Sequence, residues 1–441
     1  VVLIDLALFH IRAKSMSTTW QEHIARHTTT ALEAVRSAVK SGDFLVFGHA
    51  VAAPSSLSKA LYDDRERLTD VKAFHMLYFA EPWHVHPVLN FLDKNSRPAY
   101  LDKRVDYLPC HFHELPDYFR NGIYPVDVAL ISVSEPNEEG YCSFGVSCDY
   151  TKPAAEAARI VIAEINKQMP FIGGDNLIHV TKLDYIVPVD RPLVELPLAP
   201  IGPVEQRIGE LCAELIHDGD TLQIGIGAIP DAVLQSLRER KDLGLHTEMF
   251  TDGVMHMINS GNVTGEKKTL HPRKVVSSII MGTKALYDFV NKNDMIEMYP
   301  VDHTNDPYMV GQNDNMVSIN SCLEIDLYGQ VASEAIGLNQ YSGTGGQVDY
   351  LRGAKRSRGG RSILAFTSTA KDGTCSRIVP VLPSGATVTS GRNEVDYIAT
   401  EYGVVRLRGL TLRERALALT SIAHPDFRPG LMEVIRERFG E

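Results

Sequence analysis

The chain has 441 residues, of which 44% are hydrophobic and 22% charged, and its formal net charge is −11. This length predicts two domains, each able to bury its own core, and the composition is that of an ordinary globular protein. Nucleic-acid binding without sequence specificity needs a basic face, so the acidic balance argues against it. The six cysteines are scattered without a C-x-x-C pair, which predicts reduced thiols in a cytoplasmic protein.

The beginning of the chain is apolar but does not have the pattern of a signal peptide. Asp5 interrupts residues 1–15, which also lack a basic leader and a small-residue cleavage site. No stretch of about 18 or more uncharged apolar residues follows, so the sequence predicts no contact with a membrane. Residues 1–16 are set apart as an extension whose status the sequence leaves open.

Two pairs of alternating histidines raise the question of a metal. The pairs are His84 with His86 and His111 with His113, and alternate residues of a strand point the same way. No third group of ligands has comparable spacing elsewhere in the sequence. We therefore predict no metal site.

Two short segments of the chain are similar to each other at a separation of 177 residues. Residues 41–50 (SGDFLVFGHA) match residues 218–227 (DGDTLQIGIG), and each copy lies between two helical patterns. A repeat at domain length indicates a duplicated domain, since solenoids repeat at about 20–50 residues. Helix-like and strand-like patterns alternate in both halves. The expected fold is α/β, with two tandem, structurally similar domains and largely parallel sheets.

The boundary between these domains is predicted from proline content. Residues 190–203 contain four prolines and are typical of an extended linker. We place the first domain at residues 17–195 and the second at residues 204–441. Near the end of the second, residues 410–422 predict an amphipathic helix, capped by Thr411 with Glu414 three residues later.

Residues 218–240 predict a strand, a glycine turn and a helix. The strand is residues 221–224, the turn is Gly-Ile-Gly at residues 225–227, and Pro230 suits the first turn of a helix, where its missing N–H costs nothing. Such a turn presents free N–H groups at the positive end of a helix dipole, where an anion can bind. A tight connection without a ligand is the alternative. A dinucleotide site is disfavoured because the third glycine of G-x-G-x-x-G falls at Pro230.

Glu248 follows this unit in a stretch with mostly uncharged neighbours, residues 245–253. Taken alone, a glutamate is more often a solvated or ion-paired surface residue than a reactive one. Glu334, Glu394 and Glu401 are its rivals for a reactive role. The polar surroundings of Glu394 and the motif around Glu401 favour structural roles for those two.

A second glycine-rich loop, residues 341–348, is followed directly by a basic segment, residues 352–361 (RGAKRSRGGR). In an acidic protein this segment is either a solvated loop or a local counter-charge for phosphate groups of a ligand. The sequence alone does not choose between the two.

Several motifs together resemble the class I coenzyme A transferases, in the branch known as the acetyl-CoA hydrolase/transferase family. They are the Gly-Ile-Gly turn with its helix, the stretch around Glu248, residues 313–321, residues 345–350, residues 390–397 and residues 400–403. The resemblance covers nearly all of the chain after about residue 17. It is greatest to the enzymes that act on 4-hydroxybutyrate and on butyrate with acetate.

The resemblance implies a site and a reaction. It assigns the catalytic role to Glu248, which would form a glutamyl-CoA thioester in a ping-pong exchange of coenzyme A between acids. It places contacts with coenzyme A and the oxyanion on Gly225, Ile226, Gly227, Ala228, Ile229, Asn320, Gly345 and Gly346. A strand asparagine that bonds the neighbouring backbone is the alternative for Asn320. The family often has glycine where this chain has Ala228, which leaves acyl specificity open.

The same resemblance implies the partners. We expect acyl-CoA and short-chain carboxylates (acetate, butyrate or 4-hydroxybutyrate) as substrates, no cofactor beyond coenzyme A itself, and a cytoplasmic homo-oligomer, a dimer or larger. An acetyl-CoA hydrolase, in which water resolves the intermediate, is one alternative. A catalytically silent acyl-CoA-binding protein is the other.

Overall fold

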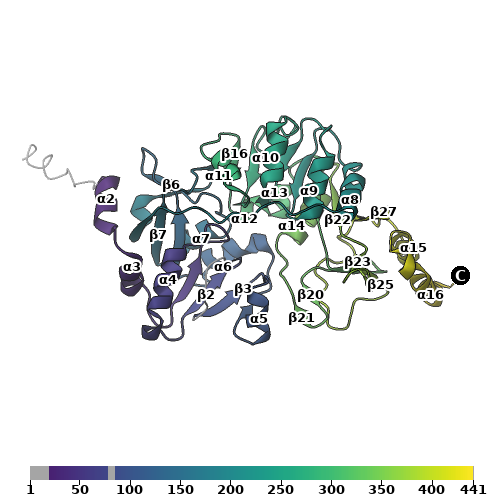
Figure 1. Cartoon of the computed structure of the whole chain (residues 1–441), viewed down its shortest axis with the longest axis horizontal. Coiled ribbons are helices and arrows are strands. Elements are labelled where there is room, and N and C mark those ends of the chain that lie inside the picture. Colours follow the sequence, from purple (N-terminus) through teal and green to yellow (C-terminus); the bar gives the residue numbers. More distant parts are fainter. Residues whose placement is uncertain (1–18, 78–84, 441) are drawn as a thin grey trace, which may run out of the picture.

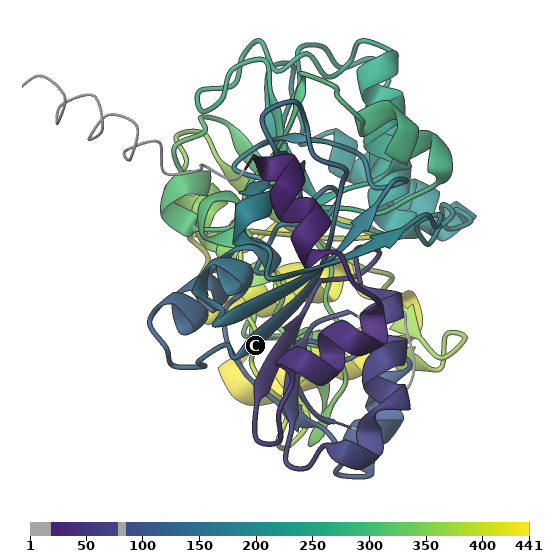
Figure 2. The same ribbon diagram turned by 90° about the vertical axis from the view of Figure 1, so that its left-hand side faces the viewer.

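The computed structural model describes residues 19–77 and 85–440 and shows two α/β domains side by side (Figure 1). The predicted extension at residues 1–16 and His84 lie outside the described residues. In the side view the helices α2 to α4 lie at the front of the first domain (Figure 2). The expected fold class, two tandem α/β domains with largely parallel sheets, is confirmed.

The first domain is built on a seven-stranded sheet in the order β10-β7-β5-β1-β2-β3-β4, with every neighbouring pair parallel. Alternate residues of β1 enter two separate cores: Phe44 and Val46 one, and Leu45 and Phe47 the other. Strands buried on both faces carry continuous apolar runs, as β5 does. The strands are β1 (Phe44–Phe47), β2 (Lys72–His75), β3 (His86–Leu89), β4 (Asp106–Tyr107), β5 (Val128–Val133), β7 (Ile160–Asn166) and β10 (Tyr185–Val189).

The second domain is built on a nine-stranded sheet in the order β27-β26-β22-β17-β11-β12-β14-β16-β8. It is parallel except for the edge strand β27, which pairs antiparallel with β26. The other edge strand, β8, comes from the first half of the chain. The strands are β8 (Gly173–Gly174), β11 (Thr221–Ile224), β12 (Gly244–His246), β14 (Val275–Ser277), β16 (Ile296–Met298), β17 (Met316–Asn320), β22 (Arg361–Ala365), β26 (Tyr397–Thr400) and β27 (Gly403–Arg406).

The repeat predicted from residues 41–50 and 218–227 is present in the topology. β1 lies between β2 and β5, and β11 lies between β12 and β17, so each copy forms a central strand with an equivalent pair of parallel neighbours. Residues 190–202 join the two sheets without a helix or strand.

The helices begin at capping residues that the local sequence supplies. Thr411 and Glu414 form a capping box at the start of α15, as predicted, and Thr30 with Glu33 does the same for α3. The helices are α2 (Trp20–His27), α3 (Ala31–Ala38), α4 (Ser55–Asp63), α5 (Ser96–Leu101), α6 (Leu115–Arg120), α7 (Thr151–Ala157), α8 (Pro203–Ala213), α9 (Ala228–Ser236), α10 (Asp252–Asn259), α11 (Lys284–Val290), α12 (Val301–Thr304), α13 (Pro307–Val310), α14 (Gln347–Arg356), α15 (Leu412–Ser421) and α16 (Arg428–Phe439). Among the described residues, none of the helices combines the length and the apolar character needed to cross a membrane.

Short strand pairs and 3-10 turns complete the fold. The strands are β6 (Tyr141–Ser143) with β9 (Leu177–His179), β13 (Met249–Phe250) with β15 (Ile279–Ile280), β18 (Glu324–Asp326) with β19 (Val331–Ala332) and β25 (Ile378–Val379), β20 (Ala335–Ile336) with β21 (Asn339–Gln340), and β23 (Thr369–Ala370) with β24 (Cys375–Ser376). The 3-10 turns are η1 (Arg65–Arg67), η2 (Phe112–Glu114), η3 (Val180–Lys182) and η4 (Pro425–Phe427).

The basic segment at residues 352–361 is not a loop throughout, contrary to one of the two interpretations offered for it. Its first five residues are the last turns of α14, and Arg361 begins β22. The helix continues here because Gly353 and Ala354 are buried against the rest of the domain, so tertiary packing outweighs the local charge.

The two domains meet along backbone hydrogen bonds close to the end of β12. The N–H of Ile280 donates to the carbonyl of Val146 (2.8 Å), and the N–H of Val301 donates to the carbonyl of Asp149 (3.2 Å). This seam brings first-domain residues 146–149 beside the segment that carries Glu248.

Candidate active site

Glu248 lies in the short connection between β12 and β13, at the carboxyl edge of the second sheet. Its backbone carbonyl accepts hydrogen bonds from the N–H groups of Ser278 (3.2 Å) and Ile279 (2.9 Å) and from the Ser277 hydroxyl (3.0 Å). Three donors on one carbonyl fix the main chain at this residue. Carboxyl edges of parallel strands are the usual place for ligand sites in α/β proteins.

The Glu248 carboxylate is held at one of its two oxygens. The amide nitrogen of Asn305, which is fully buried, donates to Oε2 at 2.6 Å. Tyr350 in turn donates its hydroxyl to the Thr304 carbonyl at 2.9 Å and lies 3.4 Å from Asn305 Oδ1, which sets the orientation of that amide. Within the described part of the chain, Oε1 has no hydrogen-bond partner, so it is the oxygen free to react.

The environment makes Glu248 a stronger base than an ordinary glutamate. Burial raises the pKa of Glu248 to about 7; the Asn305 hydrogen bond opposes the rise, and the negative charges of Asp349 and Asp149 add to it. Asp149 comes from the first domain and Asp349 from α14, so both domains contribute to the effect. A poorly solvated carboxylate with a raised pKa is a better nucleophile once it is ionised.

The second glycine loop reaches Glu248 directly. Gly346 precedes α14, and a Cβ placed on it would lie well under 3.0 Å from Glu248 Oε2 and from Asn305 Nδ2. Only glycine allows the main chain to approach the carboxylate this closely. Gly345 beside it adopts φ +52° and packs near Phe91 of the first domain.

The first glycine turn lies at the same edge of the sheet. The Thr247 hydroxyl, adjacent to Glu248, donates to the carbonyl of Ile224 at 3.1 Å, which ties the end of β11 to the Glu248 segment. The turn then continues through Gly225 and the exposed Ile226 to Gly227, where φ is +114°.

The helix α9 begins at Ala228 and Ile229, so Pro230 lies in its first turn, as predicted. No side chain caps α9, so the N–H groups of its first turn stay available to a ligand.

Asn320 and Asn305 have different partners. The amide of Asn320 exchanges two hydrogen bonds with the side-chain amide of Gln223 on β11 (2.8 and 3.3 Å), whereas the alternative interpretation had it bond the neighbouring backbone. The amide that contacts Glu248 belongs to Asn305. Nothing in the local pattern of residues 301–305 singles it out, and the sequence reasoning missed it.

The rival glutamates each have partners of their own. Glu334 accepts from Tyr107, Glu394 pairs with Arg352, and Glu401 accepts from the N–H and hydroxyl of Ser368.

Two of the histidines considered for a metal site have carboxylate partners. His113 Nδ1 lies 2.7 Å from a carboxylate oxygen of Asp349, and His86 Nε2 lies 2.8 Å from a carboxylate oxygen of Asp106. Residues 19–77 and 85–440 hold no cluster of three or more side chains suited to a metal ion.

The basic segment does not supply a charge at Glu248. Arg352 pairs with Glu394, the Lys355 ammonium donates to the Asn393 carbonyl at 2.9 Å, and Arg358 pairs with Asp314. Since α14 follows Gly346 and rises about 1.5 Å per residue, Lys355 lies about 13 Å from Gly346 along the helix. The charges of this segment therefore lie away from the Glu248 carboxylate, and its interpretation as a counter-charge for phosphate groups stays a prediction.

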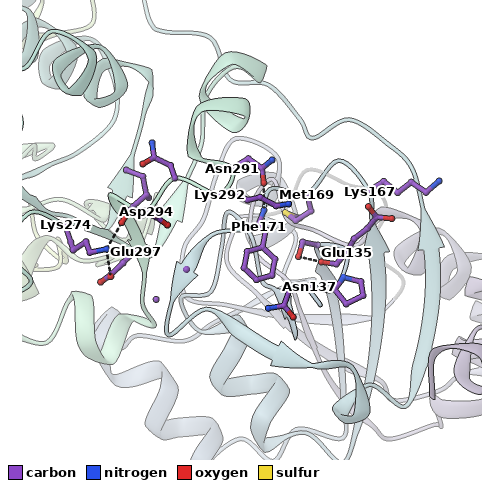
Figure 3. Close-up of a pocket in the computed structure, with 16 residues that line it drawn as sticks. Glu135, Asn137, Lys167, Met169, Phe171, Lys274, Asn291, Lys292, Asp294 and Glu297 are labelled. Atoms are coloured by element: carbon purple, nitrogen blue, oxygen red, sulfur yellow. Dashed lines mark hydrogen bonds and ion pairs between the residues drawn. The ribbon is translucent and has the colours of Figure 1, made fainter. Parts of the chain in front are cut away.

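A cavity of about 580 Å³ is lined by residues of both domains, and Figure 3 shows its lining in close-up. Its lining includes Glu135, Phe171, Lys274 and Glu297, and in the close-up Lys274 reaches toward Asp294 and Glu297. Lys274 and Asp294 precede β14 and β16, whereas Glu248 follows the end of β12. The cavity is therefore at the opposite edge of the sheet from the candidate site.

Comparison with known families identifies both parts of the chain. Residues 13–196 match the acetyl-CoA hydrolase/transferase N-terminal domain, and residues 282–435 match the C-terminal domain of the same family. Glu248 falls between these two matched segments.

Close relatives cover the whole fold. The 4-hydroxybutyrate coenzyme A transferase of Clostridium kluyveri is 53% identical, over 95% of this chain and 100% of its own. The butyryl-CoA:acetate CoA-transferase of Anaerostipes caccae is 36% identical, over 94% and 97%. The crystal structure of 4-hydroxybutyrate CoA-transferase from Porphyromonas gingivalis is 58% identical, covers 96% of this chain and 100% of its own, and superposes with a TM-score of 0.83.

The two α/β domains with parallel sheets, together with these relatives, define an enzyme of the CoA-transferase class. The chain belongs to the acetyl-CoA hydrolase/transferase family.

Proposed function

We propose that the protein moves coenzyme A between a short-chain acyl-CoA and a free carboxylate, with acetate, butyrate or 4-hydroxybutyrate as the acids, through a glutamyl-CoA thioester on Glu248. The observation that carries the proposal is the partly buried Glu248 carboxylate, with Oε2 held by Asn305 and Oε1 free. The relatives named for 4-hydroxybutyrate, at 53% and 58% identity, support the choice of acids.

The proposed reaction starts with an attack by Glu248 Oε1 on the thioester carbonyl. A C–O bond forms, the C–S bond breaks, and coenzyme A leaves as thiolate, which gives a mixed anhydride. The thiolate then attacks the glutamyl carbonyl, and the donor acid departs as a carboxylate. An incoming acid reverses both steps. Every proton and electron pair is accounted for by these groups, so the route uses no cofactor beyond coenzyme A.

Two sets of hydrogen-bond donors support the proposed stabilisation of the oxyanions. When Glu248 is acylated or carries coenzyme A, Oε2 is its carbonyl oxygen, and the Asn305 amide nitrogen already points at it. Negative charge that develops on Oε2 would be stabilised by this donor without reorganisation. The uncapped N–H groups at the start of α9 are candidates for the oxyanion of the substrate carbonyl.

Purified protein incubated with acetyl-CoA and butyrate, and in parallel with acetyl-CoA alone, separates the candidate functions. We expect butyryl-CoA in the first reaction, detected by mass spectrometry, and little loss of acetyl-CoA in the second. Rapid loss without an acceptor acid would favour the hydrolase. Binding without turnover in either reaction would favour the silent binding protein.

The activity is expected to fall at acid pH with a midpoint near 7. Because the folded-state pKa of Glu248 is raised to about 7, the carboxylate is protonated and unreactive below that value and becomes reactive as the pH rises through it. The measurement is kcat/KM for acyl-CoA between about pH 5 and about pH 9, with the melting temperature checked at each pH to exclude unfolding. If the activity instead falls with a midpoint at about pH 4.5, close to the pKa of an ordinary glutamate, the environment described for Glu248 is contradicted.

Comparing Asn305→Ala with Asn320→Ala decides which amide serves the nucleophile. Asn305→Ala is expected to lower kcat by about 10²-fold, the usual cost of losing one oxyanion donor. It should also move the midpoint of the activity loss at acid pH to a higher pH, because the Asn305 hydrogen bond lowers the pKa of Glu248. Asn320→Ala is expected to have the smaller effect, since its amide is paired with Gln223. The reverse ranking would return the role to Asn320.

A further inference from the structure

Glu334 is a buried glutamate that the proposed chemistry does not use. It lies between β19 and β20 and is 5% exposed. A buried carboxylate is costly unless hydrogen bonds compensate the lost solvation, so the identity of its partners indicates what it is for.

Glu334 binds the second glycine loop through both its main chain and its side chain. The backbone carbonyl accepts from the N–H groups of Tyr341 (2.7 Å) and Ser342 (2.9 Å). The carboxylate accepts from the amide of Gln340 (3.1 Å) and from the hydroxyl of Thr344 (3.4 Å). Residues 340–344 are thus held by one residue.

The segment that Glu334 holds leads directly to Gly346, which contacts Glu248. Thr344 is two residues before Gly346, and Gly346 is in contact with both the Glu248 carboxylate and Asn305. Only Gly345 separates Thr344 from Gly346, so a shift of residues 340–344 would be passed to Gly346 and from there to Glu248.

Residues of the first domain also bind this loop, residues 340–344. Tyr107 on the edge strand β4 donates its hydroxyl to Glu334 Oε2 at 2.7 Å. Arg97 of α5 donates to the Tyr341 carbonyl at 2.5 Å and lies over the Tyr341 ring at 3.6 Å. In Figure 1 the β20–β21 hairpin lies beside β3 and α5, across the seam between the domains.

We infer that Glu334 is a positioning residue, which uses Tyr107 of the first domain to hold residues 340–344 so that Gly346 fixes the reactive orientation of Glu248. The inference rests on the proposed function. Glu334 touches neither substrate nor the reacting oxygens in this assignment; it acts through the loop. Burial raises the pKa of the Tyr107 phenol, and the charge of Glu334 raises it further, so the phenol remains a donor throughout the working pH range.

The test removes the donor without leaving a cavity. Tyr107→Phe keeps the ring and deletes one hydrogen bond to a charged group, which is expected to slow adduct formation on Glu248 about 10-fold. The rate is followed by mass spectrometry after mixing the full chain with butyryl-CoA in the absence of an acceptor acid. The KM for butyryl-CoA should change less than the rate of adduct formation, because Tyr107 does not contact the proposed coenzyme-binding residues 225–229.

Two further variants make the result specific. Tyr118→Phe is the matched control, since the half-buried Tyr118 of α6 has no hydrogen bond from its hydroxyl among the described residues. It should keep the rate of the unmodified protein. Glu334→Gln should also slow adduct formation, and the double variant Tyr107→Phe/Glu334→Gln should be less impaired than the product of the two single effects, as expected for residues that act as a pair.

The outcomes are distinct. If the unmodified protein forms no adduct, the proposed function fails and this inference fails with it. If the unmodified protein forms the adduct but Tyr107→Phe and Glu334→Gln form it at the same rate, with or without a lower melting temperature, Glu334 has only a structural role and the proposed function stands. A slower rate with an unchanged melting temperature supports the positioning role.

Discussion

Glu248→Ala is expected to abolish coenzyme A transfer while the protein stays folded. Without the carboxylate no anhydride can form, and among residues 19–77 and 85–440 no other glutamate contacts Asn305. Glu248→Asp should also be badly impaired, because it retracts the carboxylate by about 1.5 Å and spoils the near-attack geometry. The measurements are the steady-state rate and the mass of the protein after incubation with acyl-CoA.

The adduct identifies the residue independently of the rate. Unmodified protein should gain the mass of one coenzyme A less water, hydroxylamine should remove it, and borohydride should reduce the thioester and inactivate the enzyme. The kinetics should be ping-pong, since the donor acid departs before the acceptor binds. A trapped peptide containing Glu334, Glu394 or Glu401 would show that the nucleophile is misassigned, and sequential kinetics without an adduct would contradict the mechanism itself.

Gly346→Ala is expected to lower kcat by about 10²-fold, the size of effect that a misplacement of about 1 Å can have. The new Cβ would overlap Glu248 Oε2. The backbone at this position suits alanine (φ −91°), and the overlapped atom is the end of a side chain, so the protein can fold by moving the nucleophile aside. The melting temperature should therefore change little while the activity is lost.

Gly430→Ala provides the control for that substitution. Gly430 lies in α16, and a Cβ there would meet no atom within 4 Å. This variant should keep the activity and be slightly more stable, because alanine favours a helix over glycine. Equal activities for Gly346→Ala and the unmodified protein would mean that Gly346 does not define the position of Glu248.

The parts of the site that the sequence predicted are those with a local pattern. The strand, turn and helix at residues 221–236 follow from alternation, two glycines and a proline near the helix start. Gly346 was predicted from its motif, and the structure brings it against Glu248. Asn305 was missed, because its contact with Glu248 joins residues 57 positions apart, and no local spacing encodes such a contact.

The sequence by itself determined that this protein has two similar α/β domains. The repeat, the capping boxes and the buried apolar strands depend on neighbours within a turn or a strand, which the chain carries with it. The tertiary structure alone decided which polar groups meet at the carboxyl edge of the second sheet. Asn305, Asp149 and the Glu334–Tyr107 pair reach that region only through the strand order and the domain seam. The basic segment shows the same limit, since its residues form helix and strand ends through packing against the core, where burial outweighs the preference of the charges for solvent.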